Sequence, residues 1–386
     1  MFSYGFRPFF LAAGLTGLLA VPAWLWLYRS GVSPLGAVPA QLWHGHEMIF
    51  GFIVAAFAGF LLTAVPSWTG SRGFGGVPLV VLLAIWLAGR AVFAAFDQLP
   101  FALVVVVELA FLPALLVLVA PPTLRERNRN MAMLAIAVVA WLADAASLAA
   151  IARGDATLGS LALQAALNVI LLLLTIVGGR VVPAFTSNAL RRRDQSFSIH
   201  TYPRLERILP GAMVLNLVVD LWQPALAIPA GVLALAIAIL QGWRLSGWRS
   251  LRARGEPILW VLHVAYAWLP AGFALKAAAL LAGAAWARFW LHAFGIGAAA
   301  LMILAVMTRT SLGHTGRPLV VPRSIAVAYL LLCAAALLRV VAPVLWSADY
   351  FGVLLAAGCC WTAAFAIFAA VYAPILTRRR ADGKAG

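Results

Sequence analysis

Residues 43–65 read WHGHEMIFGFIVAAFAGFLLTAV, and this stretch sets the fold class of the chain. After two histidines and Glu47, it carries no charged side chain as far as residue 65. The hydrocarbon core of a bilayer is about 30 Å thick, and a helix needs about 20 apolar residues to cross it. The stretch therefore predicts a transmembrane helix with polar groups at one end.

The rest of the chain follows the same pattern, which predicts an all-α polytopic membrane protein. Of its 386 residues, 64% are hydrophobic and 10% are charged, and the mean hydropathy is +0.99. A soluble domain carries about 25% charged residues, so this composition excludes one. Residues 1–386 are expected to form a single integral membrane domain. Its twelve predicted spans are 9–28, 43–65, 78–96, 101–120, 131–151, 159–183, 208–222, 225–243, 257–281, 289–309, 322–344 and 351–375.

The distribution of basic residues predicts the orientation. The formal net charge is +16, with 28 Lys and Arg against 12 Asp and Glu. The basic residues gather in both termini and in the loops after even-numbered spans, including a surface loop at 184–207 and a tail at 376–386. Cytoplasmic loops are enriched in Lys and Arg, so we expect both termini in the cytoplasm. The charge is interpreted as topology in a lipid bilayer, and no nucleic-acid partner is expected.

Several ionisable side chains lie inside the predicted spans, where each is costly unless it has a partner or a cavity. Arg90 and Glu108 occupy neighbouring ends of consecutive spans, so we expect them to pair with each other. A structural ion pair is also the simpler interpretation of Asp144, Lys276 and Arg339.

The histidines indicate a second possibility, because neutral imidazole is the side chain that metal ions and haem iron readily accept. The orientation places His44, His46 and His292 near the outer face as an expected outer cluster. His263 and His314 are expected near the cytoplasmic side as an inner cluster. These five are the candidate metal and haem ligands. The sixth histidine, His200, lies in the surface loop and ranks below them.

The box at 43–48, WHGHEM, allows three interpretations: a metal or haem ligand site, an interfacial hydrogen-bonded cap, or a proton relay. Two residues of an α-helix are turned about 200° apart, so His44 and His46 should point to nearly opposite faces. Glu47 follows His44 by three residues, on roughly the same face. Glu47 is therefore a candidate to orient the imidazole of His44 by a hydrogen bond, without binding the metal itself.

Arg180 and Arg309 lie at predicted cytoplasmic helix ends near the inner cluster. Long basic side chains at such ends reach the membrane surface while their stems stay in apolar surroundings, and this is the simpler interpretation. The alternative is a salt bridge to a haem propionate. No CxxCH segment is present for covalent attachment, so a haem would be bound noncovalently.

A faint internal repeat connects the second, sixth and tenth spans. Each is four spans from the next, and they leave the membrane through LTAVPSWTG (62–70), VPAFTSN (182–188) and MTRTS (307–311). This pattern predicts three four-helix units around a pseudo-threefold axis.

Several segments together resemble the NnrS family of bacterial membrane proteins. They extend over nearly the whole chain and are FSYGFRPFF (2–10), WHGHEM (43–48), GFLLTAVP (59–66), GGRVVP (178–183), HVAYAWLP (263–270) and MTRTSLGHTGRP (307–318). The family is described as containing haem and copper and as linked to nitric oxide and nitrosative stress. The resemblance implies an inner-membrane protein with noncovalent haem b, copper as a further cofactor, and nitric oxide or nitrosyl species as partners.

The ligand assignments carried by this resemblance fall on positions already singled out. His44, His46, Glu47, Arg180, His263, His292 and His314 all lie in family-like segments. The function expected from this resemblance is binding or redox chemistry of nitric oxide at a His-ligated haem. In that case the protein could be a haem-dependent oxidoreductase. The rival is a secondary transporter whose histidines, carboxylates and arginine form a proton or substrate pathway.

Overall fold

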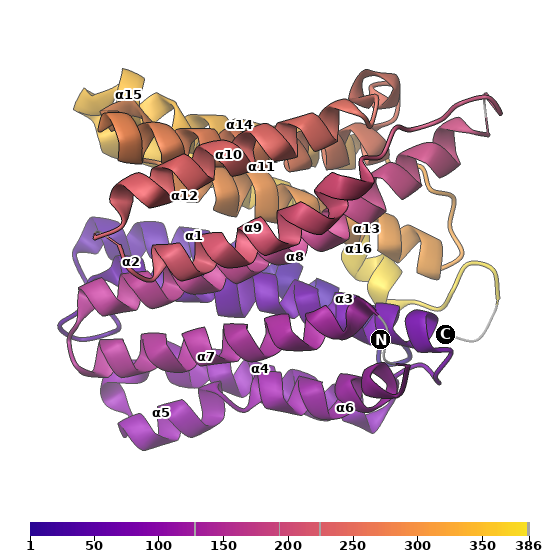
Figure 1. The fold of residues 1–386 in the computed structure, drawn as a ribbon. Helices are drawn as coiled ribbons and strands as arrows, with labels where there is room; N and C mark the ends of the chain where they lie inside the picture. The colour runs from indigo at the N-terminus through magenta and orange to yellow at the C-terminus, as the bar shows by residue number, and fades with distance from the viewer. Residues whose placement is uncertain (127–128, 193, 224, 384–386) are drawn as a thin grey trace. The chain divides into compact units, whose positions relative to one another are not determined.

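The computed structural model describes residues 1–126, 129–192, 194–223 and 225–383, and the regular structure of these residues is entirely helical. Within these described residues, eleven helical segments are long and apolar enough to cross a membrane. The chain is therefore an all-α polytopic membrane protein, as its composition predicts. Its elements (Figure 1) are α1 (Phe6–Ser30), α2 (Ala40–His46), η1 (Glu47–Ile53), α3 (Val54–Thr69), α4 (Val77–Ala94), η2 (Phe96–Gln98), α5 (Phe101–Glu108), α6 (Phe111–Glu126), η3 (Arg129–Met131), α7 (Ala132–Ala152), α8 (Ala156–Leu190), α9 (Pro203–Asp220), α10 (Ala227–Ser246), η4 (Ser250–Ala253), α11 (Pro257–Ala282), η5 (Ala285–Ala287), α12 (Trp290–His292), η6 (Ala293–Ala300), α13 (Leu301–His314), α14 (Arg323–Val340), α15 (Ala342–Leu345), η7 (Ser347–Asp349) and α16 (Tyr350–Thr377).

Eleven of the twelve predicted spans correspond to the long apolar segments, and the seventh does not. The stretch predicted at 208–222 is α9, an 18-residue helix that is absent from the candidate membrane spans. Arg204, Glu206 and Asp220 lie on it, and such side chains lower its hydropathy. Its helical state is confirmed, and its place in the membrane stays a prediction.

The predicted surface loop at 184–207 is shorter in the structure, because helices occupy both of its ends. Helix α8 continues past Pro183 to Leu190, and α9 begins at Pro203. The tail likewise begins later, since α16 extends to Thr377, and the amide of Ala381 donates to the carbonyl of Thr315 at 3.0 Å. Position 193 of the loop and positions 384–386 of the tail lie outside the described residues.

Two membrane-length segments contain a π-helix at matching places. The segment Ala40–Thr69 includes η1, which begins directly after His46, and Ala285–His314 includes η6, which begins directly after His292. π-helical turns inside α-helices are rare and occur frequently at functional sites. The match supports the predicted likeness between the second and tenth spans.

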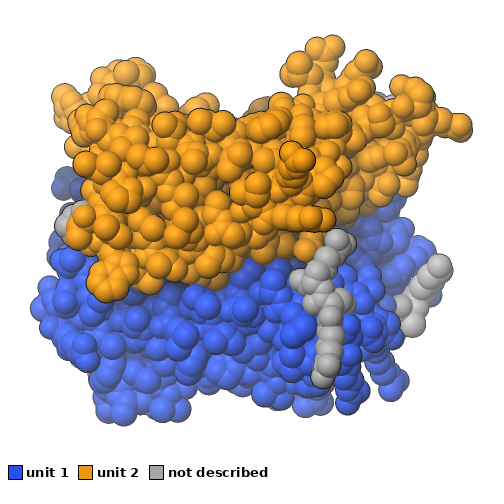
Figure 2. Space-filling model, viewed as in Figure 1, with its two compact units in different colours: residues 1–167, 310–318, 365–386 blue, residues 168–309, 319–364 orange. Residues whose placement is uncertain are grey.

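The helices pack into two compact units (Figure 2). Unit 1 comprises residues 1–167, 310–318 and 365–386, and unit 2 comprises residues 168–309 and 319–364. This division differs from the predicted three units in chain order, because each compact unit collects segments from distant parts of the sequence.

In unit 1, Arg7 ties the first helix to the last. Its side chain is buried, and Nη1 donates to the carbonyls of Leu376 at 3.0 Å and Arg378 at 2.6 Å. The final carbonyls of a helix have no partner within the helix. Arg7 therefore caps the end of α16 in addition to adding to the basic charge of the N-terminal segment.

In unit 2, Lys276 of α11 forms the centre of a buried polar cluster. Its Nζ donates to both carboxylate oxygens of Asp220 at 2.6 Å and to Asn216 Oδ1 at 2.8 Å. The amide of Asn168 donates to Asp220 Oδ2 at 2.8 Å, and that of Asn216 donates to the same oxygen at 3.2 Å. The expected structural ion pair of Lys276 is confirmed, with Asp220 as its partner.

A second buried cation of unit 2, Arg244, explains one glycine of the segment GGRVVP. Its Nη1 donates to the carbonyl of Thr175 at 2.7 Å and to the hydroxyl of Tyr266 at 2.8 Å, and its guanidinium pairs with Glu206. A Cβ at Gly179 would overlap this guanidinium. Gly179 is therefore required for the close approach of Arg244 to α8.

Replacing Gly179 with alanine is expected to destabilise the protein by about 3 kcal/mol, because overpacking at a buried site displaces the guanidinium from its partners. The measurement is the unfolding midpoint in detergent. Gly211→Ala on α9 is the control, since a Cβ there meets nothing within 4 Å. Alanine favours a helix over glycine by about 1 kcal/mol, so the control should be neutral or stabilising. Equal effects of the two changes would contradict the packing argument.

Candidate metal centre

Four helices of unit 1 contribute ionisable side chains to one buried cluster. His46 ends α2, Arg90 lies on α4, Glu108 ends α5, and Asp144 lies on α7. His46 and Glu108 follow the starts of their spans, whereas Arg90 and Asp144 lie in the second halves of theirs. Consecutive helices joined by short loops run in opposite directions, so these positions meet at one level.

Three ligand-type atoms converge within this cluster. His46 Nε2 lies 2.9 Å from Asp144 Oδ1 and 3.8 Å from Glu108 Oε1. One donor atom from each residue lies within 4.8 Å of the other two, and all three residues are buried. Imidazole nitrogen and carboxylate oxygen bind metal ions at about 2.0–2.2 Å, so one ion could contact all three after small side-chain movements. Among the residues that the structure describes, this is the one group of three or more such ligands.

The imidazole of His46 is held in position by aromatic rings. Its ring stacks on Phe93 with 3.7 Å between centroids, and the ring of Phe50 lies at 4.8 Å. The side chain is fully buried, and Nε2 faces two carboxyl groups. A single cation fits between these atoms.

The charge of the cluster favours a cation. Arg90 Nη1 pairs with Glu47 Oε1 at 2.5 Å, and Arg90 Nη2 pairs with Glu108, as the sequence predicts. With Asp144 the cluster holds three carboxyl groups, against which Arg90 supplies one positive charge. Buried charge is costly unless it is paired or coordinates a metal. With His46 neutral, a divalent ion would neutralise the two remaining negative charges.

Glu47 does not take the position expected from helical spacing. It was predicted to orient His44, yet it pairs with Arg90 and lies 3.8 Å from His46 Nδ1. The π-helix η1 begins at Glu47, so the α-helical relation between positions three residues apart no longer holds there. Glu47 therefore supports the cluster around His46.

Two glycines make room for the carboxylates. A Cβ at Gly51 would lie 2.8 Å from Glu47 Oε2, and a Cβ at Gly89 would lie 2.7 Å from Glu108 Oε2. Both distances are shorter than a carbon atom tolerates. Any larger residue at these positions would push a carboxyl group out of the cluster.

A small cavity adjoins the cluster. Glu108, Arg90 and Asp144 line it together with Trp86 and other apolar side chains, and the space open to the centre of a water-sized sphere is about 10 Å³. A cavity needs about that much to hold one water molecule. The site can therefore accept a metal ion and a very small ligand.

The other histidines of unit 1 have different surroundings. The half-buried ring of His44 stacks on Trp24, with 4.3 Å between centroids. His314 is exposed at the end of α13, where its ring lies 5.6 Å from that of Phe6. His44 and His46 thus contact different elements, in agreement with the expected divergence of their side chains.

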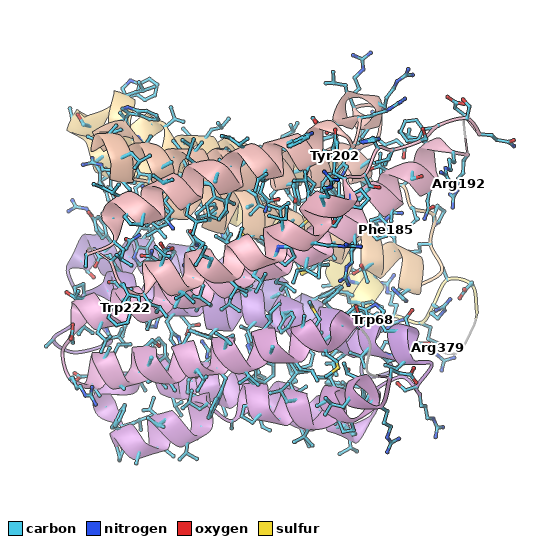
Figure 3. All side chains as sticks on the ribbon, viewed as in Figure 1. Trp68, Phe185, Arg192, Tyr202, Trp222 and Arg379 are labelled. Atoms are coloured by element: carbon cyan, nitrogen blue, oxygen red, sulfur yellow. The ribbon has the colours of Figure 1, made fainter. Side chains whose placement is uncertain are left out.

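In unit 2, two of the predicted site residues, His263 and Arg309, contact neighbouring residues of α8. His263 is buried between two hydroxyl groups, with Nε2 2.8 Å from Thr186 Oγ1 and Nδ1 2.9 Å from Ser250 Oγ. The guanidinium of Arg309 lies over the ring of Phe185, which Figure 3 labels, at 3.9 Å from the centroid. Both nitrogens of His263 are engaged by hydroxyls, an arrangement that does not fit an axial haem ligand.

The remaining predicted residues of unit 2 lie on their helices as expected. Arg180 follows Gly179 on α8 and is half-buried, and His292 ends α12 and is half-buried. Their assignment to a haem stays a prediction.

The sequence did not identify Glu108 and Asp144 as partners of His46. Both were recognised as ionisable residues inside spans, but the simpler interpretation was structural pairing. Their predicted depth in the membrane could have identified them, because each lies at about the same depth as His46. Which helix faces which is not written in the sequence.

The fold and the site define a polytopic membrane protein with a buried histidine–carboxylate cluster suited to a metal ion. The chain belongs to the NnrS family, because residues 1–380 match the family described as NnrS protein. The resemblance drawn from its segments is thereby confirmed, and it makes the chain a membrane protein related to nitric oxide. A comparison with curated proteins gives no match.

Proposed function

We propose that this chain is a metal-binding membrane protein of nitric oxide metabolism or of protection from nitrosative stress. In this proposal a divalent transition-metal ion is held by His46, Glu108 and Asp144. The observation that carries it is the convergence of one imidazole and two carboxyl groups within 4.8 Å in a buried site. Nitric oxide is small and apolar, so it dissolves in the bilayer and can reach such a site from the lipid.

The donor set indicates which ions fit. Imidazole suits zinc, copper and iron, and carboxylate suits harder ions such as manganese, so a mixed set favours a first-row divalent ion. Such an ion, when bound, supplies Lewis acidity and, for iron or copper, redox chemistry. The chain contributes the orientation of the imidazole through Phe93 and the positive charge of Arg90, which holds Glu47 and Glu108 in place.

Haem b and copper, which the family resemblance implies, are proposed as further cofactors. His44, His292 and His314 are the proposed haem ligands, and Arg180 and Arg309 are the proposed propionate partners. His46 and His263 do not fit a haem, because Nε2 of His46 faces carboxyl groups and both nitrogens of His263 are engaged. Copper would fit the His46 cluster.

The proposed location is the bacterial inner membrane with both termini in the cytoplasm. It rests on the excess of basic residues in alternate loops. Reporter fusions at the two termini test it, and a periplasmic signal from either one would contradict it.

A transporter remains a second candidate, because one observation favours it. Transporters bind substrate where helices in matching positions of a repeat are interrupted, and the π-helices η1 and η6 lie at matching places in two similar spans. In that case the cluster of Glu47, Arg90 and Glu108 would carry protons rather than a metal.

Metal analysis of the wild-type protein purified in detergent distinguishes these functions. We expect about one transition-metal ion per chain by elemental mass spectrometry, and a change in the electronic or electron paramagnetic resonance spectrum when nitric oxide is added. A Soret band in the same sample tests the haem proposal separately. A protein that contains no metal after growth in replete medium, and takes up none on reconstitution, would contradict the metal centre and favour transport.

A further inference from the structure

The cavity beside the metal centre contains unpaired polar atoms. Trp86 Nε1, Arg90 Nε and Glu108 Oε2 are buried and have no hydrogen-bond partner among the residues that the structure describes. All three residues line this one cavity. A second indole, that of Trp141, also lines the cavity, but its Nε1 donates to the carbonyl of Leu109 at 2.9 Å.

Unpaired buried polar atoms are rare in folded proteins, and each one requires an explanation such as a bound water or ligand. The indole and guanidinium N–H groups can only donate, whereas a carboxylate oxygen accepts. An occupant that satisfies the two donors must therefore have lone pairs, and Glu108 Oε2 can accept only from an occupant that carries a hydrogen. Gly89 keeps this carboxyl group at the cavity, since a Cβ there would lie 2.7 Å from Glu108 Oε2.

The size and charge of the cavity restrict the occupant further. About 10 Å³ is open to the centre of a water-sized sphere, which is about the room that one water molecule needs, so only a ligand of one or two non-hydrogen atoms is comparable in size. With a divalent ion bound, the carboxyl groups of Glu108 and Asp144 that line the cavity are neutralised, so an anion would add an uncompensated buried charge. Nitrite is therefore excluded by both its size and its charge.

We propose that this cavity is the ligand pocket of the metal centre, that it accepts a neutral oxygen- or nitrogen-containing molecule of at most two non-hydrogen atoms, and that Trp86 donates a hydrogen bond to it. The inference rests on the proposed metal centre and names the class of ligand that reaches the ion. Arg90 supplies a second donor through Nε while its terminal nitrogens remain paired with Glu47 and Glu108.

Trp86→Phe tests the proposal because it removes the N–H and retains an aromatic ring. The variant and the wild type are loaded with iron(II) without oxygen and titrated with nitric oxide, and binding is followed by the absorption spectrum. One neutral hydrogen bond contributes about 1 kcal/mol, so we expect about fivefold weaker binding in the variant. The control is Trp43→Phe, since Trp43 Nε1 is also buried without a partner but does not line the cavity. It should bind nitric oxide as the wild type does.

Leu112→Ala provides a second test through a gain of binding. Leu112 is buried and lines the cavity, so its truncation should admit imidazole, which the wild type should exclude. The size limit would be overturned if imidazole changed the spectrum of the wild type, or if it changed the spectrum of neither protein. Equal affinity for nitric oxide in Trp86→Phe and the wild type would overturn the role of Trp86.

The metal content of every variant distinguishes failure of the proposed metal centre from failure of the proposed ligand pocket. A wild-type protein without metal would overturn both the proposed function and this pocket. A full complement of iron together with unchanged ligand affinity in Trp86→Phe would overturn the pocket alone.

Discussion

Replacing His46 with alanine is expected to abolish metal binding. The variant removes the nitrogen that lies 2.9 Å from Asp144 Oδ1 and 3.8 Å from Glu108 Oε1. Changing a residue that only supports a metal ligand costs about 10–100-fold in affinity, so the loss of a ligand should weaken binding by more than about 100-fold. The measurement is metal content by elemental mass spectrometry, together with a competition titration against a chelator of known affinity.

His44→Ala is the matched control for this change. It removes an imidazole from the same short helix, two residues away, whose ring stacks on Trp24 instead of facing the carboxyl groups. The control should retain the ion of the His46 cluster, whatever its effect on haem. Retention of this ion in His46→Ala, combined with its loss in His44→Ala, would show that the ligand assignment is wrong.

Replacing Lys276 with methionine is expected to give the largest loss of stability in unit 2. The change keeps the length of the side chain but leaves Asp220 buried without its cation. Removing one partner of a buried ion pair costs about 3–5 kcal/mol, because the other charge stays uncompensated. Asn168 and Asn216 continue to donate to Asp220 Oδ2, so we expect a value near 3 kcal/mol. The measurement is unfolding in detergent, followed by tryptophan fluorescence.

The double variant Lys276→Met with Asp220→Asn separates loss of the charge pair from loss of packing. It removes both charges, so it should be more stable than Lys276→Met alone. Residues in direct contact give non-additive changes in a double-mutant cycle. Additive destabilisation by the two single changes would mean that the pair does not act as a unit.

The length of the apolar stretches made the helices predictable. Charged residues within a stretch made its assignment to the membrane harder to predict. A run such as residues 43–65 can satisfy its backbone in lipid only as a helix, and the structure has a helical segment at Ala40–Thr69. At α9 the spacing of apolar residues predicts a helix, but its charged residues lower its hydropathy, so composition alone does not assign it to the membrane. The π-helix η1 was not predictable, because it depends on the packing of its side chains against neighbouring helices.

Individual residues of the candidate site were predictable from the sequence, whereas most of the contacts between them were not. His46 and Glu47 were recognised from the box WHGHEM, and the pairing of Arg90 with Glu108 followed from their places in consecutive spans. Asp144 was recognised as costly in lipid, but its partner was not. The predicted orientation of His44 by Glu47 failed for a physical reason, since it assumed a regular α-helix through a π-helical turn.

By itself, the sequence determined that this chain is a helical membrane protein of the NnrS family and that its buried charges need partners. Those properties follow from hydropathy, length and local motifs, which are written along the chain. Only the tertiary structure decided that the carboxyl groups of Glu108 and Asp144 meet His46 and that Trp86 lines the cavity beside them. Such contacts depend on which helix faces lie together, and that is set by packing over the whole unit rather than by any single segment.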